Sequence, residues 1–316
     1  MSRKYDNVIV FGPTGTIGGL VAAEAQKQGA KVWLAMRDTS KAISAIPSHL
    51  EESGNFTRVQ ADITDPPSVT KAIATSGAKA AYLYLIHGDM TFGRGALQAM
   101  REGGVEYIVF LSGYNVKGQG EELRAIPKEN WIPFVHAQVE IAVEDVGFPY
   151  FTALRPAWFA SNFFKNYLDR SSKPNYKAPM LYEDAVFDNI APEDVGLVGG
   201  RVLAERPSDA KKETIYLCGP ELRSVKESWE LIKKITGRHD IDTAATTEAA
   251  FLQRFALLGL PDFVGKYFMR ALQESKAGFA VPDYQIGVEN VRKYAGKEPT
   301  SFADYLEAHK EEWKAL

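Results

Sequence analysis

The sequence has one cysteine, no long apolar run and no strong charge of either sign. Cys218 is the only cysteine among 316 residues, which excludes an intrachain disulfide and disfavours a metal site built from thiolates. No apolar run approaches the roughly 20 residues needed to cross a bilayer. The opening MSRKYDNVIVFG has too short an apolar stretch for a signal peptide. We therefore expect a cytoplasmic protein that binds no metal ion and no membrane.

The charged residues nearly balance. Lys and Arg number 37 against 40 Asp and Glu, the formal net charge is −3, and the basic residues form no block. This pattern gives no sign of a nucleic-acid partner. The chain does have 45% hydrophobic and 11% aromatic residues, enough for a substantial core, and a length typical of about two domains. Whether it forms a homo-oligomer is left open by the sequence.

The first 150 residues alternate between short apolar runs and helix-like segments. The runs are apolar throughout, which is typical of parallel strands covered by helices on both faces. We expect strands at Asn7–Phe11, Lys31–Met36, Thr57–Ala61, Ala80–Ile86, Tyr107–Leu111 and Tyr150–Leu154. We expect helices at Ile17–Gln28, Pro66–Ala74, Ala96–Glu102 and Trp131–Asp145.

The pattern changes after Pro156. An irregular aromatic stretch is followed by a helix at Pro192–Ala204, a strand at Thr214–Cys218 and a helix at Ser224–Ile235, and the chain looks mostly helical from Glu248. We therefore predict a first domain at residues 1–156 and a smaller α/β cap domain at residues 157–316. Some segments of the second part remain free to return to the first sheet.

A glycine loop joins the first expected strand to the first expected helix. Gly12, Gly15 and Gly18 are each three residues apart in GPTGTIG. Gly12 permits a tight turn, Gly15 lets a pyrophosphate approach the backbone, and Gly18 lets the helix pack closely on the sheet. The amides at the helix N-terminus favour a negatively charged phosphate. The alternative is a merely structural turn, but the strand–loop–helix context favours a dinucleotide site on a Rossmann-like, doubly wound parallel sheet.

The residues after the second strand indicate which dinucleotide binds. Arg37 suits the 2′-phosphate of NADP because a guanidinium pairs bidentately with phosphate, and Lys41 adds a second positive charge. Asp38 would favour NAD if it faced the ribose, and Arg37 could also be an ordinary surface residue. Asp62, after the third strand, is placed either to accept a hydrogen bond from adenine or to cap its own loop.

Several segments together resemble the NmrA-like family of atypical short-chain dehydrogenases. They are VIVFGPTGTIG, AMRDTSK, QADITDPPSV, YIVFLSGYNV, GFPYFTALRPAWFASNFF, IAPEDVGLVGGRVLAE, TIYLCGPELRS and KEPTSFADYLEAHKEEW, in that order over nearly the whole chain. The resemblance implies a Rossmann-like domain, a small C-terminal domain that closes over the substrate, and NADP(H) as cofactor. The contacts that it implies, together with their neighbours, are Gly12, Thr14, Gly15, Thr16, Ile17, Gly18, Arg37, Lys41, Asp62, Ile63, Ile86, His87, Pro156, Phe159 and Asn162.

The catalytic pair of a typical short-chain dehydrogenase is absent. That pair is a tyrosine with a lysine four residues later, which lowers the tyrosine's pKa. The matching positions here are His136 and Glu140, which share one helical face. A histidine with a pKa of about 6.5 is a candidate proton donor, and the alternative is an exposed ion pair. Ser112, Tyr114 and His87 are further candidates, each of which could instead simply end a strand.

Aromatic residues follow Pro156. Trp158, Phe159, Phe163 and Phe164 surround Asn162 and form either a wall beside the nicotinamide or part of the core. A wall of this kind suits a flat or largely apolar substrate.

The leading hypothesis for function is an NADPH-dependent reductase of a small aromatic or conjugated substrate, such as one of secondary metabolism. The family that the sequence resembles also includes NADP(H)-sensing regulators without turnover, and a redox-neutral isomerase that retains the cofactor is a further alternative. The sequence does not separate these classes.

Overall fold

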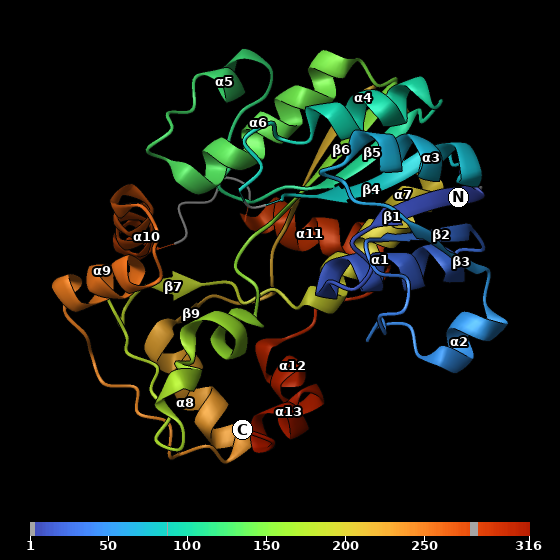
Figure 1. Ribbon diagram of the computed structural model, residues 1–316. Helices are drawn as coiled ribbons and strands as arrows, with labels where there is room; N and C mark the ends of the chain where they lie inside the picture. Colours follow the sequence, from blue (N-terminus) through green and yellow to red (C-terminus); the bar gives the residue numbers. More distant parts are fainter. Residues whose placement is uncertain (1–3, 87, 279–283) are drawn as a thin grey trace.

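The computed structural model describes residues 4–86, 88–278 and 284–316, and its centre is a parallel sheet of seven strands (Figure 1). The strand order is β3-β2-β1-β4-β5-β6-β8, and every neighbouring pair is parallel. The strands are β1 (Asn7–Phe11), β2 (Lys31–Met36), β3 (Phe56–Gln60), β4 (Ala80–Tyr84), β5 (Tyr107–Leu111), β6 (Tyr150–Pro156) and β8 (Lys212–Leu217). The predicted Rossmann-like architecture is confirmed.

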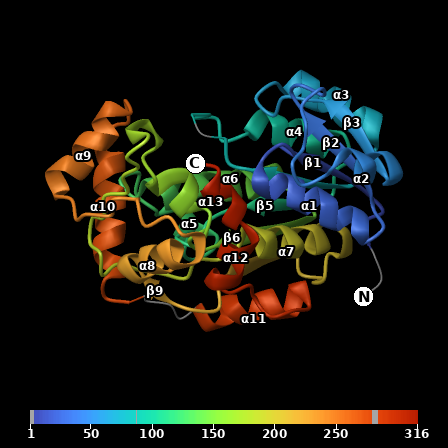
Figure 2. The same cartoon turned by 90° about the horizontal axis from the view of Figure 1, so that it is seen from below.

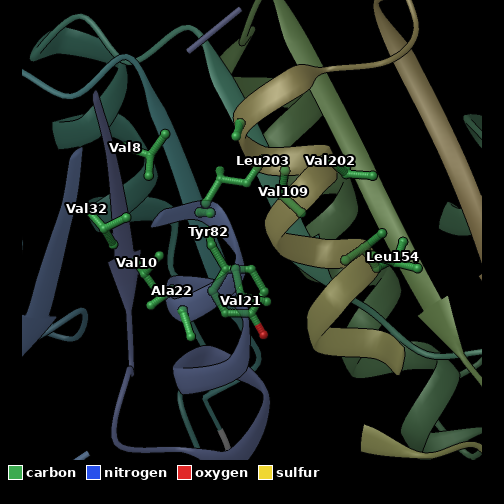
Figure 3. Close-up of a cluster of buried hydrophobic side chains, with 14 of the residues drawn as sticks. Val8, Val10, Val21, Ala22, Val32, Tyr82, Val109, Leu154, Val202 and Leu203 are labelled. Carbon is green, nitrogen blue, oxygen red and sulfur yellow. The ribbon is translucent and has the colours of Figure 1, made fainter. Parts of the chain in front are cut away.

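Helices cover both faces of the sheet, as the uniformly apolar strands predict. One face carries α1 (Thr16–Lys27), α7 (Pro192–Glu205) and α11 (Tyr284–Ala295), and the other carries α3 (Pro66–Ser76), α4 (Arg94–Glu102) and α6 (Trp131–Val146). Figure 3 shows the core of the first face, where the β1 side chains Val8 and Val10 lie near Ala22 of α1 and Tyr82 of β4.

The order of the strands fixes where a ligand binds. From β1 the chain proceeds outward to β2 and β3, and then crosses to β4 on the opposite side of β1. Crevices at such a switch point lie outside the carboxyl ends of the strands. The loop after β1, which contains Gly12, therefore lies at the expected position for a ligand.

Part of the chain beyond residue 156 returns to the sheet. β8 pairs with β6 from Phe151↔Lys212 to Pro156↔Leu217, α7 packs against α1, and α11 packs against β8 and α7. These segments complete the first layered unit, although they follow the predicted boundary. Their pairing partners lie far away in sequence, so the local pattern does not reveal them.

The remaining segments form a smaller cap beside this unit (Figure 2). Its core combines aliphatic side chains with large aromatic rings, among them Phe163, Trp229, Phe302 and Trp313. A short antiparallel pair, β7 (Val186–Phe187) and β9 (Arg223–Ser224), lies among its helices. The helices are α8 (Val225–Thr236), α9 (Glu248–Leu257), α10 (Asp262–Ser275), α12 (Phe302–Ala308) and α13 (Lys310–Lys314). The short helices α2 (Ser48–Ser53) and α5 (Glu121–Arg124) lie outside the cap.

Two acidic residues at the start of α7 hold the last segment of the chain. The buried Asp194 carboxylate accepts hydrogen bonds from the Lys297 ammonium and from the backbone amide and hydroxyl of Thr300. Glu193 pairs with His309 at 3.0 Å, and this hydrogen bond raises the pKa of His309 to about 9. These contacts link two of the segments that carry the family resemblance, IAPEDVG and KEPTSFADYLEAH, and join the end of the cap to α7.

Within the described residues, no helix is both long and apolar enough to cross a membrane.

Candidate functional site

The glycine loop is held close to its own helix and to β4. Gly12 has φ +71°, and a Cβ there would lie 2.4 Å from Cε1 of Tyr84. A Cβ on Gly18 would lie 2.3 Å from the Gly12 carbonyl oxygen, so no side chain fits where α1 approaches the loop. Gly15 is the N-cap of α1 and has no side chain to accept from the first-turn amides. Those amides are therefore suited to bind an anion.

Lysine 165 lies at the rim of this loop. Lys165 belongs to the π-helical turn Phe163–Tyr167, and its ammonium donates a hydrogen bond of 2.6 Å to the hydroxyl of Thr16. The two residues are 149 positions apart, so no local pattern predicts the contact. The contact places a positive charge at the N-terminus of α1, where a phosphate would bind.

At the end of β2, the neighbouring side chains of Arg37 and Asp38 differ in their contacts. Asp38 accepts hydrogen bonds from the amide and hydroxyl of Ser40, at 2.9 and 2.6 Å, and so serves its own turn. Arg37 and Lys41 are both exposed. The loop between them is fixed by Arg58, whose guanidinium donates to the carbonyls of Thr39 and Lys41.

Asp62 caps its own loop and lies near Arg37. Its carboxylate accepts from the amide and hydroxyl of Thr64, at 2.9 and 2.8 Å. The Thr64 amide, and to a smaller extent the charge of Arg37, hold the pKa of Asp62 below its usual value. Partial burial raises the pKa of Tyr84, and the nearby Arg37 charge opposes this rise. Arg37 and Asp62, both predicted to contact the cofactor, therefore lie near each other and near Tyr84, a residue that no local sequence signal indicates.

Two further predicted residues lie near Tyr84, the last residue of β4. Ile63 and Ile86 line one small hollow together with Tyr84. His87 lies outside the described residues.

A cavity of about 190 Å³ lies at the carboxyl ends of β5 and β6. It brings together six of the predicted site residues, Ser112, Tyr114, His136, Pro156, Phe159 and Asn162. Tyr267 and Phe268 of α10 close it from the cap side. Three separate stretches of the first unit and one helix of the cap thus meet at this cavity.

Glu140 is part of a buried ion pair below this cavity. Its oxygens accept from the Arg155 guanidinium at 2.8 and 3.0 Å, and its side chain is 0% exposed. The Ser112 hydroxyl donates to the same carboxylate at 2.6 Å. The alternative of an exposed ion pair between His136 and Glu140 is therefore wrong. This position of α6 faces the sheet, and Glu140 neutralises an arginine buried at the end of β6.

Arg155 also fixes the loop that follows β5. Its guanidinium donates to the carbonyls of Val116 and Gly118 and to the Tyr216 hydroxyl, at 3.0, 3.2 and 2.9 Å. The sequence signal for this role was a charged residue at the end of an otherwise apolar strand, YFTALRP. An arginine buried there requires a partner.

His136 lines the cavity in a defined orientation. Its Nδ1 lies 2.8 Å from the Ile132 carbonyl oxygen, which favours the tautomer with the proton on Nδ1. A Cβ on Gly113 would lie 3.8 Å from His136 Nε2, so that edge of the ring faces the loop after β5. Tyr114 packs edge-to-face on Tyr216 at 5.7 Å, with the Lys117 ammonium 3.7 Å from its ring centroid.

The predicted aromatic wall divides into two parts. Trp158 and Phe159 line the cavity. Phe163 is 1% exposed and packs on Trp229, and Phe164 packs on Trp313, so both belong to the cap core. The division occurs where the chain enters the π-helical turn, which points the second pair toward the cap.

A second pocket of about 410 Å³ adjoins the first. Trp158, Asn162 and Phe268 line both, and the second extends between the π-helical turn and the helices α9 and α10.

In the ranges that the structure describes, no group of three or more His, Cys, Asp or Glu is arranged to hold a metal ion.

Comparison with known proteins identifies relatives along the whole chain. A nitrogen metabolite regulation-like protein, bik4, of Gibberella fujikuroi is 36% identical over 96% of this chain and 97% of its own length. Festuclavine dehydrogenase of Aspergillus fumigatus is 27% identical over 69% of each chain.

Solved structures share the fold at lower identity. The Citrobacter triphenylmethane reductase has a TM-score of 0.70 at 19% identity and covers 96% of this chain and 99% of its own. The NADPH-dependent quinone oxidoreductase of Escherichia coli, in complex with NADPH, has a TM-score of 0.70 at 18% identity and covers 95% and 99%.

The family model described as the NmrA-like family matches residues 4–306. This chain belongs to the NmrA-like family.

Proposed function

We propose that the protein is a cytoplasmic NADPH-dependent reductase of a small aromatic or conjugated compound. The observation that carries the proposal is the cavity lined by His136, which adjoins an aromatic pocket of about 410 Å³ at the carboxyl ends of the strands. A protein that only sensed the dinucleotide would not need a second, largely apolar pocket beyond it.

The cofactor assignment follows the chain from β1 to β6. The glycine loop and Lys165 would hold the pyrophosphate, and Arg37 with Lys41 the 2′-phosphate. Asp62 and Ile63 would border the adenine, and Ile86, Pro156, Phe159 and Asn162 the nicotinamide. The E. coli quinone oxidoreductase with this fold was crystallised with NADPH, which supports the choice of cofactor.

When bound, the cofactor supplies a hydride to the electrophilic carbon of the substrate. His136 delivers the matching proton to the substrate oxygen or nitrogen, and its bond to the Ile132 carbonyl keeps Nε2 as the donating atom of the imidazolium. Glu140 and Arg155 hold Ser112 and the β5 loop in place, and so act as positioning residues. Tyr114 is the alternative proton donor in the same cavity.

A regulatory function is the second candidate, because the relative with 36% identity is named for nitrogen metabolite regulation. In that case the two pockets would bind no hydride acceptor. The bound state would be read by a partner, and NADP⁺ and NADPH would stabilise different conformations. A redox-neutral isomerase with retained cofactor is a further variant, which also gives no net oxidation of NADPH.

The test is steady-state oxidation of NADPH with an aromatic aldehyde, a conjugated enone and naphthoquinone as acceptors. We expect turnover with at least one acceptor, and a loss of about 100-fold in kcat for His136→Gln. Tyr114→Phe, in the same cavity, is the matched comparison and should change kcat less. NADPH affinity should stay within about twofold in both variants, since neither side chain is assigned to the phosphates. No oxidation with any acceptor, while NADPH binds, would overturn the reductase and leave the regulator and the redox-neutral isomerase as candidates.

A further inference from the structure

The pocket next to the His136 cavity is lined with aromatic rings from several parts of the cap. They come from the π-helical turn, from β7, from α8 and from both helices of the α9–α10 pair. These rings are Tyr167, Phe187, Trp229, Phe251, Phe255 and Phe268. Such a lining favours a flat, unsaturated ligand, because ring faces and edges stack on one another.

The charged residues of this pocket are all positive. Lys165 and Arg254 line it, and no Asp or Glu is among the described residues that do so. Asn162 and Asn166 complete its polar lining. A mainly apolar pocket with charges of one sign selects for a ligand of the opposite sign, because desolvation strengthens the attraction.

Lys165 and Arg254 differ in the contacts that their side chains make. Lys165 donates to Thr16 in the glycine loop and so belongs to the cofactor side. With the described residues, Arg254 on α9 forms one hydrogen bond, a long one of 3.5 Å to the Asn166 carbonyl, and no ion pair. The Asp169 carboxylate accepts hydrogen bonds from the amide and hydroxyl of Ser171, which lower its pKa, and the charge of Arg254 lowers this pKa further. The half-buried guanidinium of Arg254 thus has capacity for a further acceptor.

We propose that the substrate of this site is a flat aromatic compound with an acidic group, such as a carboxylate or sulfonate, and that Arg254 binds that group. The ring system lies between the cap aromatics, and the reacting end extends past Trp158 and Asn162 into the cavity of His136. This inference rests on the proposed reductase function for the identity of the reacting end. The binding of an aromatic anion to Arg254 stands independently of turnover.

The test uses two fluorescent probes that differ only in a sulfonate: anilinonaphthalene sulfonate and anilinonaphthalene. Titrations are made with NADPH present. We expect the sulfonate to bind at least about tenfold more tightly than the neutral probe, and Arg254→Met to remove that preference. Neutral-probe affinity should change less than about threefold, since methionine keeps the apolar lining.

Two further variants control the experiment. Lys266→Met removes an exposed cation of α10 that pairs with Asp262 and does not line the pocket, and it should leave the preference unchanged. Arg254→Lys keeps the positive charge and should keep most of the preference for the sulfonate probe. Equal affinities of the wild-type protein for the two probes, or a sulfonate preference that survives Arg254→Met, would overturn the proposal.

A turnover assay with naphthoquinone and naphthoquinone sulfonate separates this inference from the reductase proposal. A lower KM for the sulfonate, lost in Arg254→Met, supports both. Reduction of both quinones with equal KM overturns the anionic-substrate inference and leaves the reductase intact. Sulfonate-selective probe binding, with no oxidation of NADPH by either quinone, by the aromatic aldehyde or by the enone, supports the anion site and overturns the reductase.

Discussion

The two ends of the proposed cofactor site are built in different ways. The glycine-loop end is formed mainly by consecutive residues, the backbone of Gly12 and the start of α1, to which the distant Lys165 adds a positive charge. The β5–β6 end depends on Ser112, Glu140 and Arg155, which are brought together from three separate elements. The first end can be recognised from local spacing, whereas the second is held by a buried ion pair whose partners only the fold identifies.

The largest effect is expected at the β5–β6 end. Arg155→Leu should lower the free energy of unfolding by about 3–5 kcal/mol, because it leaves the buried Glu140 carboxylate with the Ser112 hydroxyl and with Lys212, whose ammonium lies 4.0 Å away, in place of two guanidinium hydrogen bonds. The double variant Arg155→Leu/Glu140→Leu should recover much of this loss. Urea denaturation measures both. The surface pair of Lys4 and Asp209 provides the control, and Lys4→Leu should have little effect. An Arg155→Leu protein as stable as the wild type would contradict the comparison.

The same contrast explains how much could be predicted from the sequence. β1, β2 and β5 match the predicted ranges, because their apolar runs and bounding residues are local signals. The sequence predicts the strand β8 beyond the boundary at residue 156 but leaves open whether it returns to the first sheet, because its pairing with β6 is a long-range contact. For the same reason the sequence offers Glu140 only as a catalytic candidate beside His136 or as half of an exposed ion pair. Its i, i+4 neighbour is visible in the sequence, whereas Arg155 on the next strand is not.

At the glycine-loop end, Gly18→Ala should reduce NADPH affinity by about 100-fold. The added Cβ meets the Gly12 carbonyl, so α1 must move away from the loop that presents its amides. Isothermal titration calorimetry gives the affinity. Lys27→Gly weakens the same helix at its far end and should leave NADPH binding nearly unchanged. Equal losses in the two variants would mean that the helix as a whole, and not its approach to Gly12, determines binding.

A smaller effect separates the pyrophosphate from the 2′-phosphate. Lys165→Met should weaken the binding of NADPH and NADH alike by about tenfold, because the Lys165 charge lies beside Thr16 and the shared pyrophosphate. Lys177→Met serves as control, because this cap lysine makes no hydrogen bond or ion pair with the described residues of the glycine loop. If Lys165→Met affected NADPH alone, Lys165 would have to be reassigned to the 2′-phosphate.

The smallest effect concerns the contact that joins the end of the cap to α7. The pKa of His309 is raised to about 9 by its bond to Glu193, so protonation stabilises the folded state. This contribution is complete below the unfolded pKa of about 6.5 and is lost as the pH rises through 9. We expect a fall of about 1 kcal/mol across that interval after allowance for solvent screening. His309→Gln should lack this fall, and an identical pH dependence of its melting temperature would exclude the assignment.

The most direct test of the central claim is the affinity of the wild-type protein and Arg37→Ala for NADPH, NADP⁺, NADH and NAD⁺. The account predicts that both phosphorylated forms bind about 100-fold more tightly than the others, and that Arg37→Ala removes most of this preference while NADH affinity stays the same. Failure of all four to bind, or a preference for NADH that persists in Arg37→Ala, would contradict an NADP(H) site at this loop.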